Sequence, residues 1–63
     1  MVRKNIKRLR QQKKLSQERL ARLSDISLNT LTKLESGFTK RPSIQTIKKI
    51  ADALEVPIDK LVN

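Results

Sequence analysis

Residues 15–31, LSQERLARLSDISLNTL, contain one short pattern twice, and this repeat decides how the chain folds. In both segment 15–20 (LSQERL) and segment 26–31 (ISLNTL), an apolar residue precedes a serine and a leucine lies four positions after it. A serine in front of a helix accepts a hydrogen bond from a backbone N–H of the first turn. The apolar residue before the serine packs on the fourth helical residue. Ser16 and Ser27 therefore each predict a helix start.

The two predicted helices are short and nearly adjoin in the sequence. The first would cover residues 17–24, and after the connection Asp25-Ile26 the second would cover residues 28–36. Two short helices joined by a tight turn form a helix-turn-helix. The small side chain of Ala21 would let the two helices approach closely. The same spacing also suits an ordinary helical pair in a small bundle, because geometry alone does not imply function.

Helical spacing of apolar residues continues through the rest of the chain, and no stretch alternates as a strand would. Ser43 provides a third cap, Gly37 suits the end of a helix, and Pro57 suits the first turn of a last helix. We therefore predict a single all-α domain over residues 1–63, with helices at 2–13, 17–24, 28–36, 44–54 and 57–62.

The chain is strongly basic, and this limits the class of partner. It carries 15 Lys and Arg against 6 Asp and Glu, a net charge of +9 in 63 residues. Such an excess attracts polyanions, although a solvated surface would also explain part of it. The sequence has no Cys and no His, which argues against a disulfide, a metal site and any cofactor held by those ligands. No apolar run is long enough to span a bilayer or to act as a secretory signal.

The segment from Ser16 to Ser43 resembles the helix-turn-helix of the phage repressor and Cro family, the Xre-type regulators. The similar residues are SQExLA at 16–21, ISxxTLxKLESG at 26–37 and TKRPS at 39–43, and IADALEV at 50–56 is similar to that family's fourth helix. The resemblance covers nearly the whole chain. It implies a compact five-helix lambda-repressor-like fold with the helix-turn-helix at 17–36, and a cytoplasmic protein of bacterial or phage origin.

Four positions depart from the family's usual residues. Asp25 and Glu55 stand where glycine is common, and Asp tolerates the left-handed backbone better than most residues do. Ser24 replaces a larger apolar residue, and Leu28 replaces a polar one. We expect the changes at Ser24 and Asp25 to affect the angle between the two helices rather than the presence of the motif.

The resemblance implies that the 28–36 helix reads bases in the major groove. Asparagine can pair with adenine and lysine can reach guanine O6 and N7, whereas leucine can offer only an apolar contact, for example to a thymine methyl group. Leu28 could instead pack on a partner or on the first helix. By helical phase, the outward residues of this helix are Leu28, Asn29, Thr32 and Lys33.

A second set of residues is expected on the DNA backbone. Helix N-termini attract anions, and a basic loop can follow the phosphates without reading sequence. The set comprises Arg10, Gln17, Thr39, Lys40, Arg41 and Ser43. Lys40 and Arg41 would also suit an ordinary solvated loop. The resemblance further implies an ion pair between Arg10 and Glu35 that holds the first helix to the end of the third.

The C-terminal apolar residues suggest a dimer. They are more than a short last helix needs for itself, and in the family this region resembles the two-fold contact of a homodimer. Alternatively, they only seal the core of the monomer. The residues in question are Val56, Ile58, Leu61 and Val62.

These features predict a sequence-specific regulator that binds double-stranded DNA, most simply a repressor on a palindromic operator, with neither a membrane nor a small-molecule substrate as partner. An antitoxin or a restriction-system controller could use the same domain. From other classes, a basic amphipathic peptide for membranes or RNA and a protein-binding module stay open. An enzyme is not expected, because the chain lacks a nucleophile–base set and a glycine-rich phosphate loop.

Overall fold

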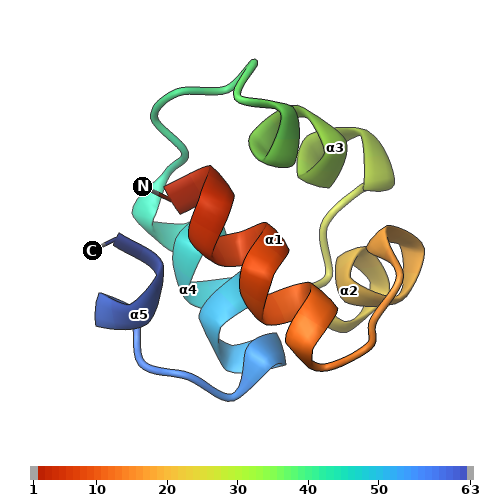
Figure 1. Ribbon diagram of the computed structural model, residues 1–63. Coiled ribbons are helices and arrows are strands. Elements are labelled where there is room, and N and C mark those ends of the chain that lie inside the picture. Colours follow the sequence, from red (N-terminus) through yellow and green to blue (C-terminus); the bar gives the residue numbers. More distant parts are fainter. Residues whose placement is uncertain (1, 63) are drawn as a thin grey trace.

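The computed structural model describes residues 2–62, with side chains from Asn5 onward, and this part of the chain folds into α-helices without strands (Figure 1). The helices are α1 (Val2–Gln12), α2 (Gln17–Leu23), α3 (Leu28–Ser36), α4 (Ile44–Leu54) and α5 (Asp59–Val62). The predicted bounds of α3 and α4 are confirmed. Helices α1 and α2 each end one residue before the predicted position, and α5 begins two residues later than predicted.

Three serines begin three of the helices, as the sequence predicts. The Oγ atom of Ser16 accepts a hydrogen bond from the backbone N–H of Arg19 at 3.0 Å. Ser27 and Ser43 do the same for the N–H groups three residues ahead of them, at 3.0 and 3.1 Å. Each bond satisfies a backbone donor that the first helical turn would otherwise leave without a partner.

Four residues in left-handed backbone conformation make the turns between helices. Gly37 ends α3 at φ 86°, and the others are Lys14, Asp25 and Glu55 at φ 57–58°. For a residue with a Cβ, this conformation costs about 1–2 kcal/mol of free energy. Asp25 and Glu55 are the two positions where family members commonly have glycine, and the backbone geometry at both is the one that glycine adopts most easily.

Among the described residues, the buried hydrophobic side chains are all aliphatic. Helix α1 packs against α3, α4 and α5, and α2 packs against α3 and α4. Figure 1 shows α1 crossing the centre of the molecule, with α3 and α5 on opposite sides of it. The fully buried large side chains are Ile6, Leu20, Leu31, Leu34, Ile50, Leu54 and Leu61.

A buried hydrogen bond fastens the short α5 to α1. The Nδ2 atom of Asn5 donates to the backbone oxygen of Leu61 at 2.9 Å, across 56 residues of sequence. A helix of four residues is not stable by itself, so α5 depends on this bond and on its packing against α1 and α4. Leu61 is 0% exposed.

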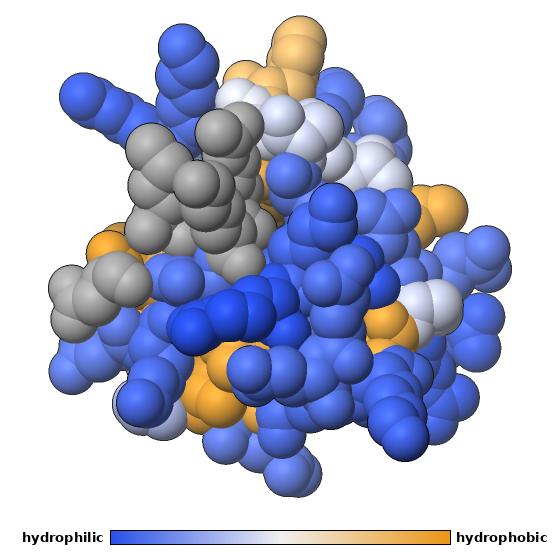
Figure 2. Space-filling view, viewed as in Figure 1, coloured by the Kyte–Doolittle hydropathy of each residue, from blue (hydrophilic) through white to orange (hydrophobic). Residues whose placement is uncertain are grey.

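The face seen in Figure 2 is mainly hydrophilic, with small and separate apolar spots. Within residues 2–62, no helix has the length and apolar character needed to cross a membrane.

Candidate nucleic-acid interface

Helix α3 has a buried face and an exposed face. Leu31 and Leu34 point into the core, at 0% and 2% exposure. On the other face Asn29 and Lys33 are exposed, and Leu28 is 41% exposed. Leu28 thus keeps part of its surface open to a partner or to DNA. The exposed face is free to meet a groove of DNA.

Thr32, the fourth residue expected to read bases, is partly buried. Its Oγ1 atom donates a hydrogen bond to the backbone oxygen of Asn29 at 2.9 Å. The hydroxyl proton is thus used within the helix. Toward a base, Thr32 would offer its methyl group and the lone pairs of Oγ1.

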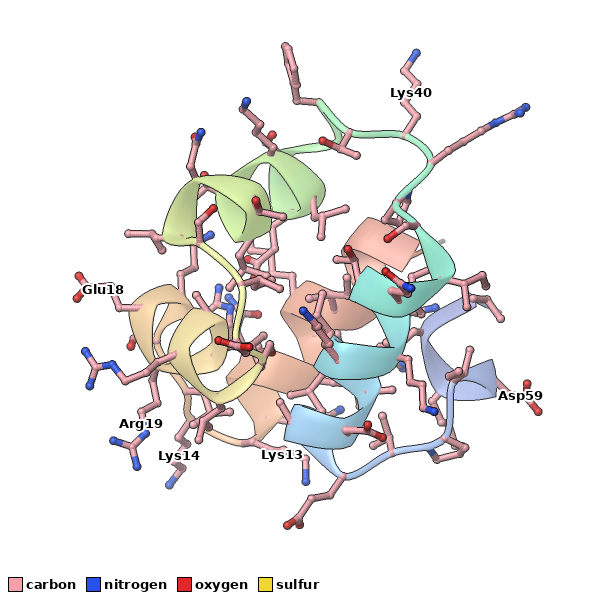
Figure 3. The ribbon with its side chains drawn as sticks, turned by 180° about the vertical axis from the view of Figure 1, so that it is seen from behind. Lys13, Lys14, Glu18, Arg19, Lys40 and Asp59 are labelled. Carbon is pink, nitrogen blue, oxygen red and sulfur yellow. The ribbon has the colours of Figure 1, made fainter. Side chains whose placement is uncertain are left out.

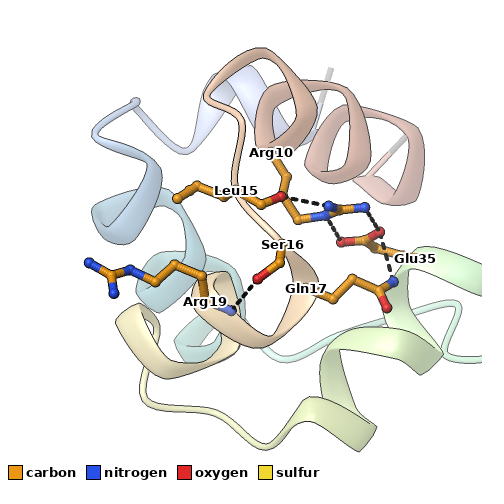
Figure 4. A network of polar contacts seen from close by, with 6 residues as sticks. All are labelled: Arg10, Leu15, Ser16, Gln17, Arg19 and Glu35. Carbon is orange, nitrogen blue, oxygen red and sulfur yellow. Dashed lines mark hydrogen bonds and ion pairs between the residues drawn. The ribbon is translucent and has the colours of Figure 1, made fainter.

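An ion-pair network joins α1, α2 and α3 (Figure 4). The Nε and Nη2 atoms of Arg10 donate to the two carboxylate oxygens of Glu35, at 2.8 and 3.0 Å. The Nη1 atom of Arg10 donates to the backbone oxygen of Leu15 at 2.7 Å, and the Nε2 atom of Gln17 donates to Glu35 at 3.1 Å. The pair expected from the resemblance is therefore present, with two additional partners.

The pair is shielded from water, which makes it different from a surface salt bridge. The side chains of Arg10 and Glu35 are 11% and 3% exposed. The two parallel N–H···O bonds are charge-assisted and fix the relative orientation of the two side chains. Glu35 lies in the last turn of α3, so the network holds the C-terminal end of that helix against α1 and α2.

This network restricts how Arg10 and Gln17 could contact a phosphate. A guanidinium has five N–H groups, and three of those of Arg10 are engaged within the protein. A phosphate contact from Arg10 would be secondary to its hold on Glu35. The carboxamide nitrogen of Gln17 has two N–H groups, and the bond to Glu35 uses one of them.

The loop from Gly37 to Ser43 leaves α3 in a defined conformation. The backbone N–H of Thr39 donates to the backbone oxygen of Lys33 at 3.2 Å, which draws the loop toward the last turn of α3. Lys40 and Arg41 are exposed, and Figure 3 shows Lys40 projecting away from the helices. Ser43 differs from them because its hydroxyl is bonded to the N–H and Oγ1 of Thr46.

Basic side chains also occur far from this loop. Figure 3 shows Lys13, Lys14 and Arg19 near the turn between α1 and α2, at the opposite end of the molecule from Lys40. Positive charge is therefore not confined to one face, and charge alone could not have located the interface.

The C-terminal apolar residues divide into three groups. Leu61 is fully buried, so it belongs to the monomer core and its assignment to a dimer contact is wrong. Val56 and Ile58 are partly buried and pack on the core. Val62, at 42% exposure, retains the most surface of the four for a second chain.

Two features near the helix-turn-helix were not predicted from the sequence. Phe38 is 77% exposed, and the Nζ atom of Lys33 lies 5.6 Å from the centroid of its ring. Ser24 is 2% exposed, and its Oγ atom has no hydrogen-bond partner among the described residues. Ser24 is the C-cap residue of α2, and Phe38 is the residue directly after Gly37, the C-cap of α3.

Comparison with known proteins agrees with this geometry. A family model described as "Helix-turn-helix" matches residues 6–61. The chain is 40% identical over 57 residues to the HTH-type transcriptional regulator RghRB of Bacillus subtilis, covering 90% of this chain and 41% of that protein. It is 35% identical over 57 residues to the HTH-type transcriptional repressor RghR of the same organism, covering 90% of this chain and 42% of that protein. The chain thus spans about two fifths of the length of these relatives.

Proposed function

Because the chain belongs to the Xre- and Cro/C1-type helix-turn-helix family of DNA-binding, non-enzymatic transcriptional regulators, we propose that it represses transcription from a palindromic operator. Helix α3 would lie in the major groove, as the recognition helix does in this motif. The name of the relative RghR, a transcriptional repressor, supports repression over activation. The relatives are bacterial, and we expect the protein to act on DNA in the cytoplasm.

One observation carries the proposal, namely the separation of the two faces of α3. The buried leucines and Glu35 fix the helix to the protein, while Leu28, Asn29 and Lys33 are presented to the outside. Asn29 can form two hydrogen bonds with adenine, and Lys33 can donate to guanine. An exposed helix that carries such groups and is held rigidly from behind is suited to reading a groove.

The elements on either side of α3 supply the contacts to phosphate. The N-terminal end of α2, with Gln17, lies before it, and the loop with Thr39, Lys40 and Arg41 lies after it. These residues would fix the register of the protein on the duplex without reading sequence. The Ser43 hydroxyl oxygen accepts the N–H of Thr46, so a phosphate contact from Ser43 would use its O–H proton or its backbone N–H.

We further propose that two copies bind one operator. Val62 provides exposed apolar surface at the C-terminal end, with Val56 and Ile58 partly exposed beside the core. Two half-sites one helical turn apart, about 34 Å, would match a two-fold dimer. Because this apolar surface is small, we expect the dimer to be weak in free solution. Its two chains should associate more tightly on the palindrome.

The test is to select an operator from random duplexes and then to measure base-by-base affinity profiles for single variants. Asn29→Ala and Lys33→Ala should each cost about 1–3 kcal/mol and relax preference at one or two positions. Lys40→Ala should weaken binding to all sequences about equally, because phosphates carry no sequence information.

Lys49→Ala is the matched control, since Lys49 is an exposed lysine of α4 outside α3 and the loop. It should change neither affinity nor preference by much, and circular dichroism should show all four variants folded. If Lys40→Ala changes base preference while the two α3 variants leave it intact, α3 is not the element in the groove.

A further inference from the structure

Phe38 is the only aromatic residue of the chain, and it lies outside the core. The sequence contains one Phe, no Tyr and no Trp. Aromatic side chains are usually the largest contributors to a small core, yet this ring is 77% exposed at the start of the loop that follows α3. The core is filled by aliphatic side chains instead, so packing within the monomer does not explain why an aromatic residue stands here.

The ring contacts one of the residues proposed to read bases. The Nζ atom of Lys33 lies 5.6 Å from the ring centroid, within the range of a cation–π interaction. In such a contact the ammonium is attracted to the negative face of the ring. Among the described residues, this is the one cation–π contact that the fold makes.

The backbone around Phe38 holds the ring in this place. Gly37 turns the chain in left-handed conformation, and the N–H of Phe38 then donates to the Oγ atom of Ser36 at 3.3 Å. The N–H of Thr39 donates a hydrogen bond to the backbone oxygen of Lys33 at 3.2 Å. These contacts close the chain around the last turn of α3, so that the ring is set beside the lysine of that same turn.

We propose that Phe38 is a positioning residue that determines where Lys33 reaches on the DNA. The inference rests on the proposed function. An exposed lysine has a long, flexible side chain that loses much rotamer freedom when its ammonium is fixed. The ring occupies one side of the ammonium, so Lys33 samples fewer positions before binding. The ammonium has three N–H donors, and those directed away from the ring stay available to a guanine edge.

This role differs from a direct contact between the ring and DNA. If Phe38 acts through Lys33, its removal matters only when Lys33 is present. If the ring instead packs on a sugar or on a thymine methyl group, its removal weakens binding to the same extent with or without the lysine. A double-mutant cycle separates the two cases.

The binding experiment uses the selected operator and three substitutions. Phe38→Leu keeps apolar bulk but removes the aromatic face, whereas Phe38→Tyr keeps it. We expect Phe38→Leu to weaken binding about two- to fivefold, the value of an exposed cation–π contact, and to flatten preference at the base position that Lys33→Ala also affects. Phe38→Tyr should retain both the wild-type affinity and the wild-type base preference. In the Lys33→Ala background, Phe38→Leu should have no further effect.

The contact itself is measured in the free protein by nuclear magnetic resonance. The ring current of Phe38 should shift the ε-methylene protons of Lys33 upfield, and Phe38→Leu should abolish the shift while Phe38→Tyr retains it. The same protons of Lys40 serve as the control and should not move. This measurement does not depend on DNA.

Three results would overturn the inference. Equal effects of Phe38→Leu with and without Lys33 would assign the ring to a direct DNA contact. An unchanged affinity and profile in Phe38→Leu would leave the ring without a role in binding, and an absent ring-current shift would remove the contact. In each of these cases the chain would still select an operator. Failure of the wild-type chain to select any sequence would instead refute the proposed function, and this inference with it.

Discussion

Replacing Glu35 by alanine should destabilise the domain far more than the loss of an ordinary surface charge. Glu35 is 3% exposed and accepts hydrogen bonds from both Arg10 and Gln17. The substitution leaves the Arg10 guanidinium, itself only 11% exposed, without its counter-charge. Removing one partner of a buried pair costs about 3–5 kcal/mol, because the remaining charge is uncompensated.

This loss is large for a chain of 63 residues. At about 0.05–0.15 kcal/mol per residue, the whole free energy of unfolding is about 3–9 kcal/mol. A domain of this size loses about 4–8 °C of melting temperature per kcal/mol, so the midpoint should fall by at least about 12 °C. Glu35→Ala is therefore expected to be partly unfolded near room temperature if the wild-type stability lies at the low end of that range.

Thermal and urea unfolding followed by circular dichroism would measure the effect. Glu18→Ala is the control, because Glu18 is an exposed glutamate on α2 and should cost less than about 1 kcal/mol. A second control replaces both partners, Arg10→Met with Glu35→Leu. Such apolar pairs are often neutral or stabilising relative to the ion pair, so the double variant should be more stable than Glu35→Ala. A cost for Glu35→Ala below about 1 kcal/mol, the value of an exposed pair, would refute the reasoning.

Three further predictions concern binding, assembly and backbone strain. The logarithm of the operator affinity should fall linearly with the logarithm of salt concentration, by about 0.9 per phosphate neutralised, and a flat response in a salt titration would argue against nucleic acid as the partner. Val62→Asp should leave the unfolding free energy within about 0.5 kcal/mol and weaken binding to a palindrome but not to a single half-site; sedimentation of a one-to-one complex of the wild type on a palindrome would count against the dimer. Glu55→Gly should raise the free energy of urea unfolding by about 0.5–1 kcal/mol by relieving the left-handed conformation, and an unchanged value would show that Glu55 is unstrained.

The helices could be predicted from the sequence because their signals are local. Each capping serine acts on an N–H three residues away, and Gly37 acts on the turn that it ends. The predicted end of α1 and the predicted start of α5 were less accurate, for a physical reason. Lys14 adopts left-handed backbone without being a glycine, so α1 stops earlier than its composition indicates. After Pro57 the chain first makes bonds between residues three apart, from the N–H of Lys60 to the oxygen of Pro57 and from that of Leu61 to that of Ile58, and α5 begins only at Asp59.

The candidate site was predictable only in part, because several of its contacts join distant residues. Helical phase places Asn29 and Lys33 on the exposed face of α3, since that phase depends on nearby apolar residues. The bond between Gln17 and Glu35 crosses 18 positions, and the bond between Asn5 and Leu61 crosses 56. The periodic spacing of apolar residues gives no information about contacts between residues so far apart in the sequence. For the same reason the choice between a dimer contact and the monomer core, which the sequence left open for Leu61, could not be made from its place in a short amphipathic segment.

The division of α3 into a buried face and an exposed face has a consequence for evolution. Substitutions at Leu28, Asn29 and Lys33 fall on exposed positions, where most changes alter stability by less than about 0.5 kcal/mol. Substitutions at these positions can therefore change which operator is bound while the stability of the domain stays above the threshold below which most variants are lost. Libraries randomised there should consist largely of folded members, so that each sampled sequence is tested for what it binds rather than for whether it folds.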